Sequence, residues 1–84
     1  MITLTAKNLE LRGIAHRVNK ETGNLYYLLN VEDDEGTPYQ FYAKDSSNFE
    51  QGLKKGDMVD ISFVYLKFGK DERINVFSVR KSNE

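Results

Sequence analysis

Three stretches of the 84-residue chain place an aromatic side chain close to cations. Tyr26 and Tyr42 lie in two apolar stretches that follow turn-like sequences, and Phe68 precedes a glycine in the charged segment LKFGKDER. Flat π-faces stack with nucleic-acid bases, and neighbouring Lys or Arg side chains bind the phosphates. These residue types therefore predict noncovalent binding of a single-stranded nucleic acid.

The candidate binding residues combine these rings with one apolar side chain and six cations. They are Arg12, Arg17, Lys20, Tyr26, Leu28, Tyr42, Lys44, Phe68, Lys70 and Arg73. Two alternatives remain open at this point. The tyrosines could be ordinary, half-exposed strand residues, and the segment around Phe68 could fold back and bury the ring.

The net charge of −1 disfavours a general polyanion binder, since such domains usually carry a basic excess. The charges are nevertheless segregated along the chain. Acidic residues crowd into 32–35, whereas basic residues gather early in the chain and again late, where Arg73, Arg80 and Lys81 fall. This distribution permits one positive groove on a slightly acidic molecule.

Catalytic and metal-binding chemistry have little support in the sequence. His16 is the only histidine, cysteine is absent, and the carboxylates of residues 32–35 lie in a turn without the spacing of a calcium loop. A surface or phosphate-facing position suits His16 better than a catalytic one. We therefore expect no enzyme, catalytic residue, metal, cofactor or small-molecule substrate.

The absence of cysteine also rules out a disulfide framework and fits a reducing compartment. No apolar run approaches the roughly 20 residues that span a bilayer, and the first ten residues lack a basic start followed by an apolar stretch. We expect a cytoplasmic protein with no membrane association.

Hydrophobic alternation predicts five strands separated by turn-like sequences. The expected strands cover residues 9–18, with a bulge at Gly13, and then residues 25–32, 39–44, 58–66 and 74–79. The alternation also predicts which face each side chain occupies. Leu25, Tyr27, Leu29, Val31, Tyr39, Phe41 and Ala43 should face the core, and Tyr26, Leu28, Asn30, Gln40, Tyr42 and Lys44 should face outward.

The pattern changes in residues 45–56, where Phe49 and Leu53 are four apart and Gly52 or Gly56 could end a short helix. The expected order is then β-β-β-α-β-β in a single domain of residues 1–84. This order is typical of an all-β, five-stranded OB-fold, a Greek-key barrel with a short helical connection between its third and fourth strands. A five-stranded SH3-like barrel is the main alternative.

Two motifs resemble the small helix-destabilising single-stranded DNA-binding proteins of filamentous phages, the gene V protein-like family. GNLYYL, with Gly23 and Tyr26, is similar to the glycine-tyrosine DNA-binding loop of that family, and KFGKDERI is similar to its hairpin with a Phe-Gly tip. The resemblance extends over residues 10–81. It implies an OB-fold, a symmetric dimer, and cooperative coating of single strands through aromatic and basic side chains. It assigns the loop aromatic to Tyr26, a third-strand aromatic to Tyr42 and the hairpin tip to Phe68.

The sequence thus predicts a non-enzymatic protein that coats single-stranded DNA, or RNA, during replication of a phage or plasmid. A homodimer is expected, because Val64 and Leu66 would otherwise leave an apolar patch on the outer side of the fourth strand. The alternatives are a small barrel that binds protein partners and an OB protein that binds RNA.

Overall fold

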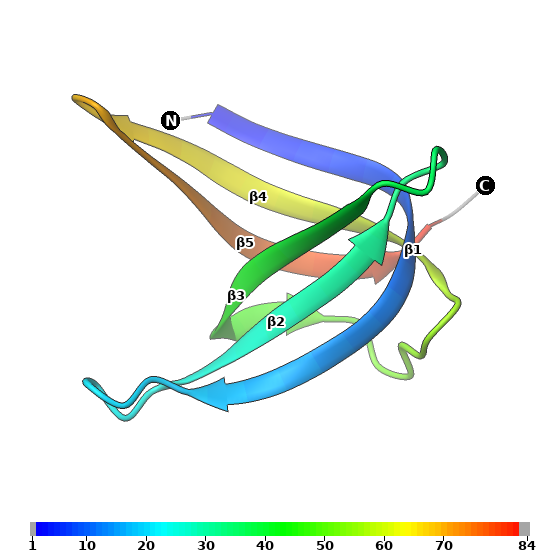
Figure 1. Cartoon of the computed structure of the whole chain (residues 1–84), viewed down its shortest axis with the longest axis horizontal. Coiled ribbons are helices and arrows are strands. Elements are labelled where there is room, and N and C mark those ends of the chain that lie inside the picture. Colours follow the sequence, from blue (N-terminus) through cyan, green and yellow to red (C-terminus); the bar gives the residue numbers. More distant parts are fainter. Residues whose placement is uncertain (1, 83–84) are drawn as a thin grey trace.

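The computed structural model describes residues 2–82, apart from the side chains of residues 45 and 46, and forms one sheet closed into a barrel (Figure 1). Its five strands are β1 (Ile2–Val18), β2 (Leu25–Glu32), β3 (Pro38–Phe49), β4 (Met58–Phe68) and β5 (Asp71–Lys81). The expected all-β barrel is therefore present. The described residues contain no helix with the length and apolar character needed to cross a membrane.

The strands follow the order β1-β2-β3-β5-β4 around the barrel, and β4 pairs with β1 to close it. The β3–β5 pair is parallel and the other four pairs are antiparallel. β1 is long enough, at 17 residues, to pair with β4 through its first half and with β2 through its second half. One strand thereby joins both sides of the barrel.

Two irregularities bend β1. The register with β2 shifts between Leu11 and Gly13, which confirms the expected bulge at this glycine. A second shift, between Ala6 and Leu9 in the pairing with β4, contains Asn8 in the left-handed region at φ 58°. Asparagine tolerates this conformation better than most residues. The strand begins at Ile2 rather than at the expected residue 9.

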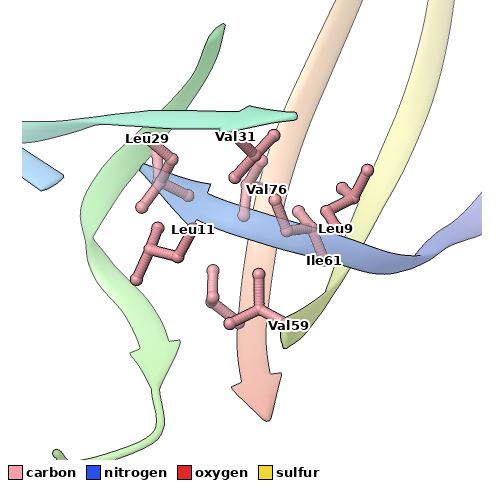
Figure 2. Packing of buried hydrophobic residues seen from close by; sticks show 9 residues of the cluster. Leu9, Leu11, Leu29, Val31, Val59, Ile61 and Val76 are labelled. Carbon is pink, nitrogen blue, oxygen red and sulfur yellow. The ribbon is translucent and has the colours of Figure 1, made fainter. Parts of the chain in front are cut away.

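The core gathers short apolar side chains from all five strands (Figure 2). Its buried members are Leu9, Leu11, Leu29, Val31, Ala43, Val59, Ile61, Val76 and Val79. The alternation predicted the inward positions of Leu29, Val31 and Ala43. Leu25 and Tyr39 share that parity but are exposed, because both lie at the ends of their strands, where the barrel no longer covers them.

The expected helix between the third and fourth strands is wrong. β3 continues to Phe49 and pairs with β5 through Asn48 and Phe49, and the Glu50 backbone N–H donates to the Val79 carbonyl. Turns at residues 51–52 and 55–56 then lead into β4. Phe49 and Leu53 both pack against the core, as the sequence suggested, but from a strand and a turn.

The β4–β5 hairpin projects beyond the barrel. β3 pairs with β5 only from Val76 onward, so residues 64–75 form an extension that we call the arm. Its tip is a two-residue turn with Gly69 at φ 61°, the sign that the first central position of a type II′ turn requires. The tips of the arm and of the β1–β2 hairpin project from the same end of the molecule (Figure 1).

Candidate nucleic-acid interface

The outer face of β1, β2 and β3 brings an aromatic ring between two cations. Arg17 of β1 pairs in register with Tyr26 of β2, which pairs in turn with Lys44 of β3. Cross-strand partners share a face of the sheet, so these side chains form one row. In the neighbouring row, Leu28 lies opposite Tyr42. Four residues that alternation placed on this face are therefore together on it.

Tyr26 and Tyr42 lie diagonally across these rows and stack on each other. Their ring centroids are 4.8 Å apart and their planes differ by 25°. Tyr42 is 48% exposed, whereas Tyr26 is half-buried. The pair is therefore one aromatic surface whose outer ring is open to a ligand.

The β1–β2 loop extends this surface. Lys20 and Glu21 line a hollow together with Tyr26 and Tyr42. The loop is held closed by hydrogen bonds from the Gly23 N–H to the Asn19 carbonyl and from the Asn19 N–H to the Asn24 carbonyl. A cation thus lies at the open end of the stacked tyrosines, although Glu21 reduces the local positive charge.

Arg12 does not join this group. It lies at the β1 bulge, where its guanidinium donates to Glu10 at 2.7 Å and lies 4.0 Å from Glu32. The hydrogen bond with Glu10, followed by attraction from Glu32, raises the pKa of Arg12 above its ordinary value. The acidic partners satisfy this cation, so the basic part of the face is the end that carries Arg17, Lys20 and Lys44.

The arm presents a second, separate group of expected residues. Phe68 is 63% exposed at the tip, which excludes the alternative that the tip buries its ring. Lys70 lies in the turn, and Arg73 pairs with Leu66 across the arm. Among the described residues, the close aromatic pairs do not include Phe68.

The expected patch at Val64 and Leu66 differs from the prediction. Both side chains are half-buried and line a hollow that also contains Lys44. Two other exposed apolar side chains lie on the opposite face of the β4–β5 hairpin. There Ile2, at 54% exposed, pairs with Tyr65, which pairs with Ile74, at 46% exposed.

His16 lies at the surface, which is one of the two positions expected for it, but it does not lie on the cationic face. It shares the face of Tyr27, opposite to Arg17, and its ring lies 4.2 Å from the Tyr27 ring at a tilt of 43°. Tyr27 in turn contacts the Phe49 ring at 4.6 Å. His16 is therefore exposed but packed on aromatic rings, on the side away from the cationic row.

The acidic turn of residues 32–35 has a local structural role. Asp33 accepts hydrogen bonds from the backbone N–H groups of Thr37 and Glu35 and from the Tyr39 hydroxyl. The bond from Thr37 contributes most to holding the Asp33 pKa below its ordinary value. Among the described side chains, which exclude those of residues 45 and 46, no group of three or more acidic or histidine residues is placed to hold a metal ion.

Sequence reasoning did not identify Phe77, which is 41% exposed in β5 and lines the hollow beside Lys44. A signal was present: apolar residues alternate at Ile74 and Val76, but the next one in this series falls at Val79, so the parity of the alternation changes after Val76. Such a change indicates a bulge. The register shift at this point places Phe77 as the additional residue of β5.

Comparisons of the chain with protein-family models, curated proteins and solved structures found no match.

Proposed function

We propose that the protein binds single-stranded nucleic acid, with DNA as the first candidate, through base stacking and phosphate contacts and without chemistry on the strand. The observation that carries the proposal is the stacked Tyr26–Tyr42 pair on the outer face of the barrel, with Arg17 and Lys44 in register on either side of Tyr26. Base stacking on aromatic side chains contributes roughly 1–3 kcal/mol per base and tolerates any sequence.

The architecture supports the same proposal. OB-folds bind oligonucleotides on the face of their second and third strands and with the loops that join strands 1–2 and 4–5. The strand order β1-β2-β3-β5-β4 is compatible with that fold, and the corresponding loops here carry Lys20 and the exposed Phe68. We therefore propose an OB-type barrel in which the tyrosine pair is the central contact and the arm tip a peripheral one.

A titration of a fluorescent dT oligonucleotide at two salt concentrations tests the proposal. Affinity should fall as salt rises, because each phosphate contact on a single strand releases about 0.7 counterions. The same titration with an oligo(U) ribonucleotide of equal length determines the preference between DNA and RNA. Absence of binding at low salt would reject the proposed function.

A protein-binding barrel is the second candidate, favoured by the exposed apolar face that Ile2 of β1 forms with Ile74 of the arm. We propose that a second copy of the chain covers this face, because Ile2 and Ile74 are exposed apolar side chains there and the cation on this face, Lys67, lies opposite Glu72. Association through this face should persist at high salt, whereas nucleic-acid binding should weaken. Salt dependence thus separates the two kinds of contact.

A further inference from the structure

A hollow on the outer side of the barrel continues from the stacked tyrosines toward the arm. Lys44 borders both regions, since it adjoins Tyr26 in the β2–β3 register and lines the hollow with Leu66 and Phe77. Arg73 lies on the same face because it pairs with Leu66. The outer surface therefore remains cationic and partly apolar as it passes from β3 to β5.

The bulge in β5 determines the position of Phe77. Ser62 pairs with Ser78 and Phe63 with Val76, which leaves Phe77 without a partner on β4. Val76 points into the core at 4% exposed, and Phe77 points outward at 41% exposed. A large ring is thus held at the surface by the backbone, although water gives it no reward there.

The parallel register places this ring within reach of a strand bound to the tyrosines. Ala43 pairs with Val76, so Tyr42 lies level with Asn75 and Phe77 lies two residues further along β5. One strand spacing and two residue rises separate the Cα atoms of Tyr42 and Phe77 by about 8 Å. The Tyr26 and Tyr42 rings form one platform at 4.8 Å, whereas this larger separation leaves room for a base on each of Tyr42 and Phe77.

We propose that Phe77 is a second base-stacking platform, and that Lys44 contacts the phosphate between the base on Tyr42 and the base on Phe77. The nucleic acid then crosses the strands in the order β2, β3, β5 toward Arg73, rather than running along β2 and β3 toward Glu10 and Glu32. This inference rests on the proposed function and extends the binding surface onto β5.

The charges around the hollow favour a nucleic acid over a second copy of the chain. The cation Lys44 and the polar residues Ser47 and Asn75 line the hollow with the Phe77 ring, and Arg73 lies further along the same face, an arrangement suited to phosphates and base edges. The acidic residue on this face of the arm, Asp71, lies at the tip opposite Phe68, away from the hollow. The apolar face suited to another copy lies on the reverse side of the arm.

Binding of dT oligonucleotides by Phe77→Ala, Phe77→Leu and Ile14→Ala tests the inference. Ile14 is a matched control, since it is an apolar strand residue with 38% exposure that faces away from Arg17 and belongs to neither proposed binding surface. Both Phe77 variants should bind roughly 5- to 150-fold more weakly, the range that corresponds to about 1–3 kcal/mol of stacking, and Ile14→Ala should bind like the wild type. Phe77→Leu keeps an apolar side chain, so a loss shared by both variants at an unchanged melting temperature reports the lost π-face.

Photocrosslinking of an oligonucleotide with 5-iodouracil gives a second measurement that does not depend on stability. Peptides that contain Phe77 and Tyr42 should both carry the crosslink. The inference would be overturned if Tyr42→Ala weakened binding and neither Phe77 variant changed it. The proposed function would then still stand. Absence of wild-type binding would remove both. Weaker self-association of Phe77→Ala in sedimentation, with unchanged DNA affinity, would assign the ring to a protein contact instead and overturn the inference.

Discussion

Arg12 and Arg17 differ in whether a neighbouring carboxylate neutralises the cation, and therefore in whether the side chain is free to bind a phosphate. Arg12 donates to Glu10 at 2.7 Å and lies near Glu32, whereas Arg17 donates to the carbonyl of its neighbour His16 and lies beside Tyr26. A guanidinium that bonds a neutral carbonyl keeps its net charge for a phosphate. The position in the sequence does not distinguish the two, but their surroundings do.

We expect Arg17→Ala to weaken dT binding and to lower the slope of log affinity against log salt by about 0.7, the loss of one phosphate contact. Arg12→Ala should change that slope much less, because Glu10 and Glu32 already neutralise the side chain. Titrations of both variants at three salt concentrations measure the slopes. Equal slopes for the two variants would contradict the conclusion that Arg17, and not Arg12, contacts a phosphate.

Because Tyr26 and Tyr42 stack on each other, we expect the losses of binding free energy in Tyr26→Ala and Tyr42→Ala not to be additive. Tyr42→Ala should weaken binding by about 1–3 kcal/mol, as for one stacked base. Tyr26→Ala should weaken it as well, because Tyr26 supports the Tyr42 ring at 4.8 Å. The double variant should then lose clearly less than the sum of the single losses, since residues in contact are coupled. A double-mutant cycle with fluorescent dT measures this coupling, and additive losses would show two independent platforms.

At the scale of the elements, Asp60 of β4 joins three parts of the chain. Its Oδ1 accepts a hydrogen bond from the Ser82 hydroxyl at 2.6 Å and from the Asn8 backbone N–H at 3.0 Å. The Ser82 bond contributes most to lowering the pKa of Asp60 below its ordinary value. This carboxylate therefore holds the second bulge of β1 and the end of β5 against β4.

The lowered pKa of Asp60 predicts the direction in which its contribution to stability changes with pH. Because the folded state holds the Asp60 proton more weakly than the unfolded state, its contribution is present above the ordinary pKa of 3.8 and is lost as pH falls below it. Asp60→Asn should lower the melting temperature at pH 7 by several degrees, as expected for about 0.5–1.5 kcal/mol per hydrogen bond. Its melting temperature should then fall less steeply than that of the wild type between about pH 5 and 3.

Thermal unfolding followed by circular dichroism across this pH range measures both effects. Ser82→Ala serves as a partial match, because it removes the main donor and leaves the carboxylate in place. Parallel curves for Asp60→Asn and the wild type would show that Asp60 contributes nothing to the acid sensitivity.

The sequence predicted most of the strands because apolar and polar residues alternate with a period of two wherever one face of a strand is buried. That period identified β2 and the outward positions of Tyr26 and Tyr42. It failed in residues 45–56 because Phe49 and Leu53, four apart, contact the core equally well from a strand followed by a turn. The spacing of four is therefore not specific to a helix.

Features that depend on pairing between strands were not predicted, although the change of parity in β5 was a signal for one of them. The neutralisation of Arg12 requires the β1–β2 register, which brings Glu10 opposite Glu32. The exposure of Phe77 depends on a bulge, and a bulge moves a side chain to the other face without altering composition. The sequence therefore predicted the residues of the candidate site on β2 and β3 but not Phe77 on β5.

At the scale of the whole molecule, the two faces of the arm have different chemical character. One face carries the exposed apolar side chains of Ile2 and Ile74, and the other carries Leu66 with Arg73. This division would let the proposed self-association and the proposed nucleic-acid binding occur at the same time. The binding of the two ligands would then be additive or cooperative rather than competitive.

Ile74→Lys should shift the protein toward the monomer in sedimentation velocity, because a charge in an apolar contact must be desolvated without a partner. Thr3→Lys, which pairs with Val64 and so faces the other side, should leave the association unchanged. Neither substitution should abolish binding of a short oligonucleotide. A wild-type protein that remains monomeric at high concentration would contradict the assignment of this face.

The double pairing of β1 has a consequence for how the barrel forms. The Thr5 hydroxyl lies 3.1 Å from that of Ser62, a residue 57 positions later in the chain. At synthesis rates of about 5–20 residues per second, the first half of β1 waits roughly 3–11 s before its partner strand is made. During that interval it is an unpaired edge, and edges of this kind recruit other chains unless polar side chains interrupt them. Thr3, Thr5 and Lys7 alternate along this segment and would keep a nascent chain from aggregating until β4 arrives.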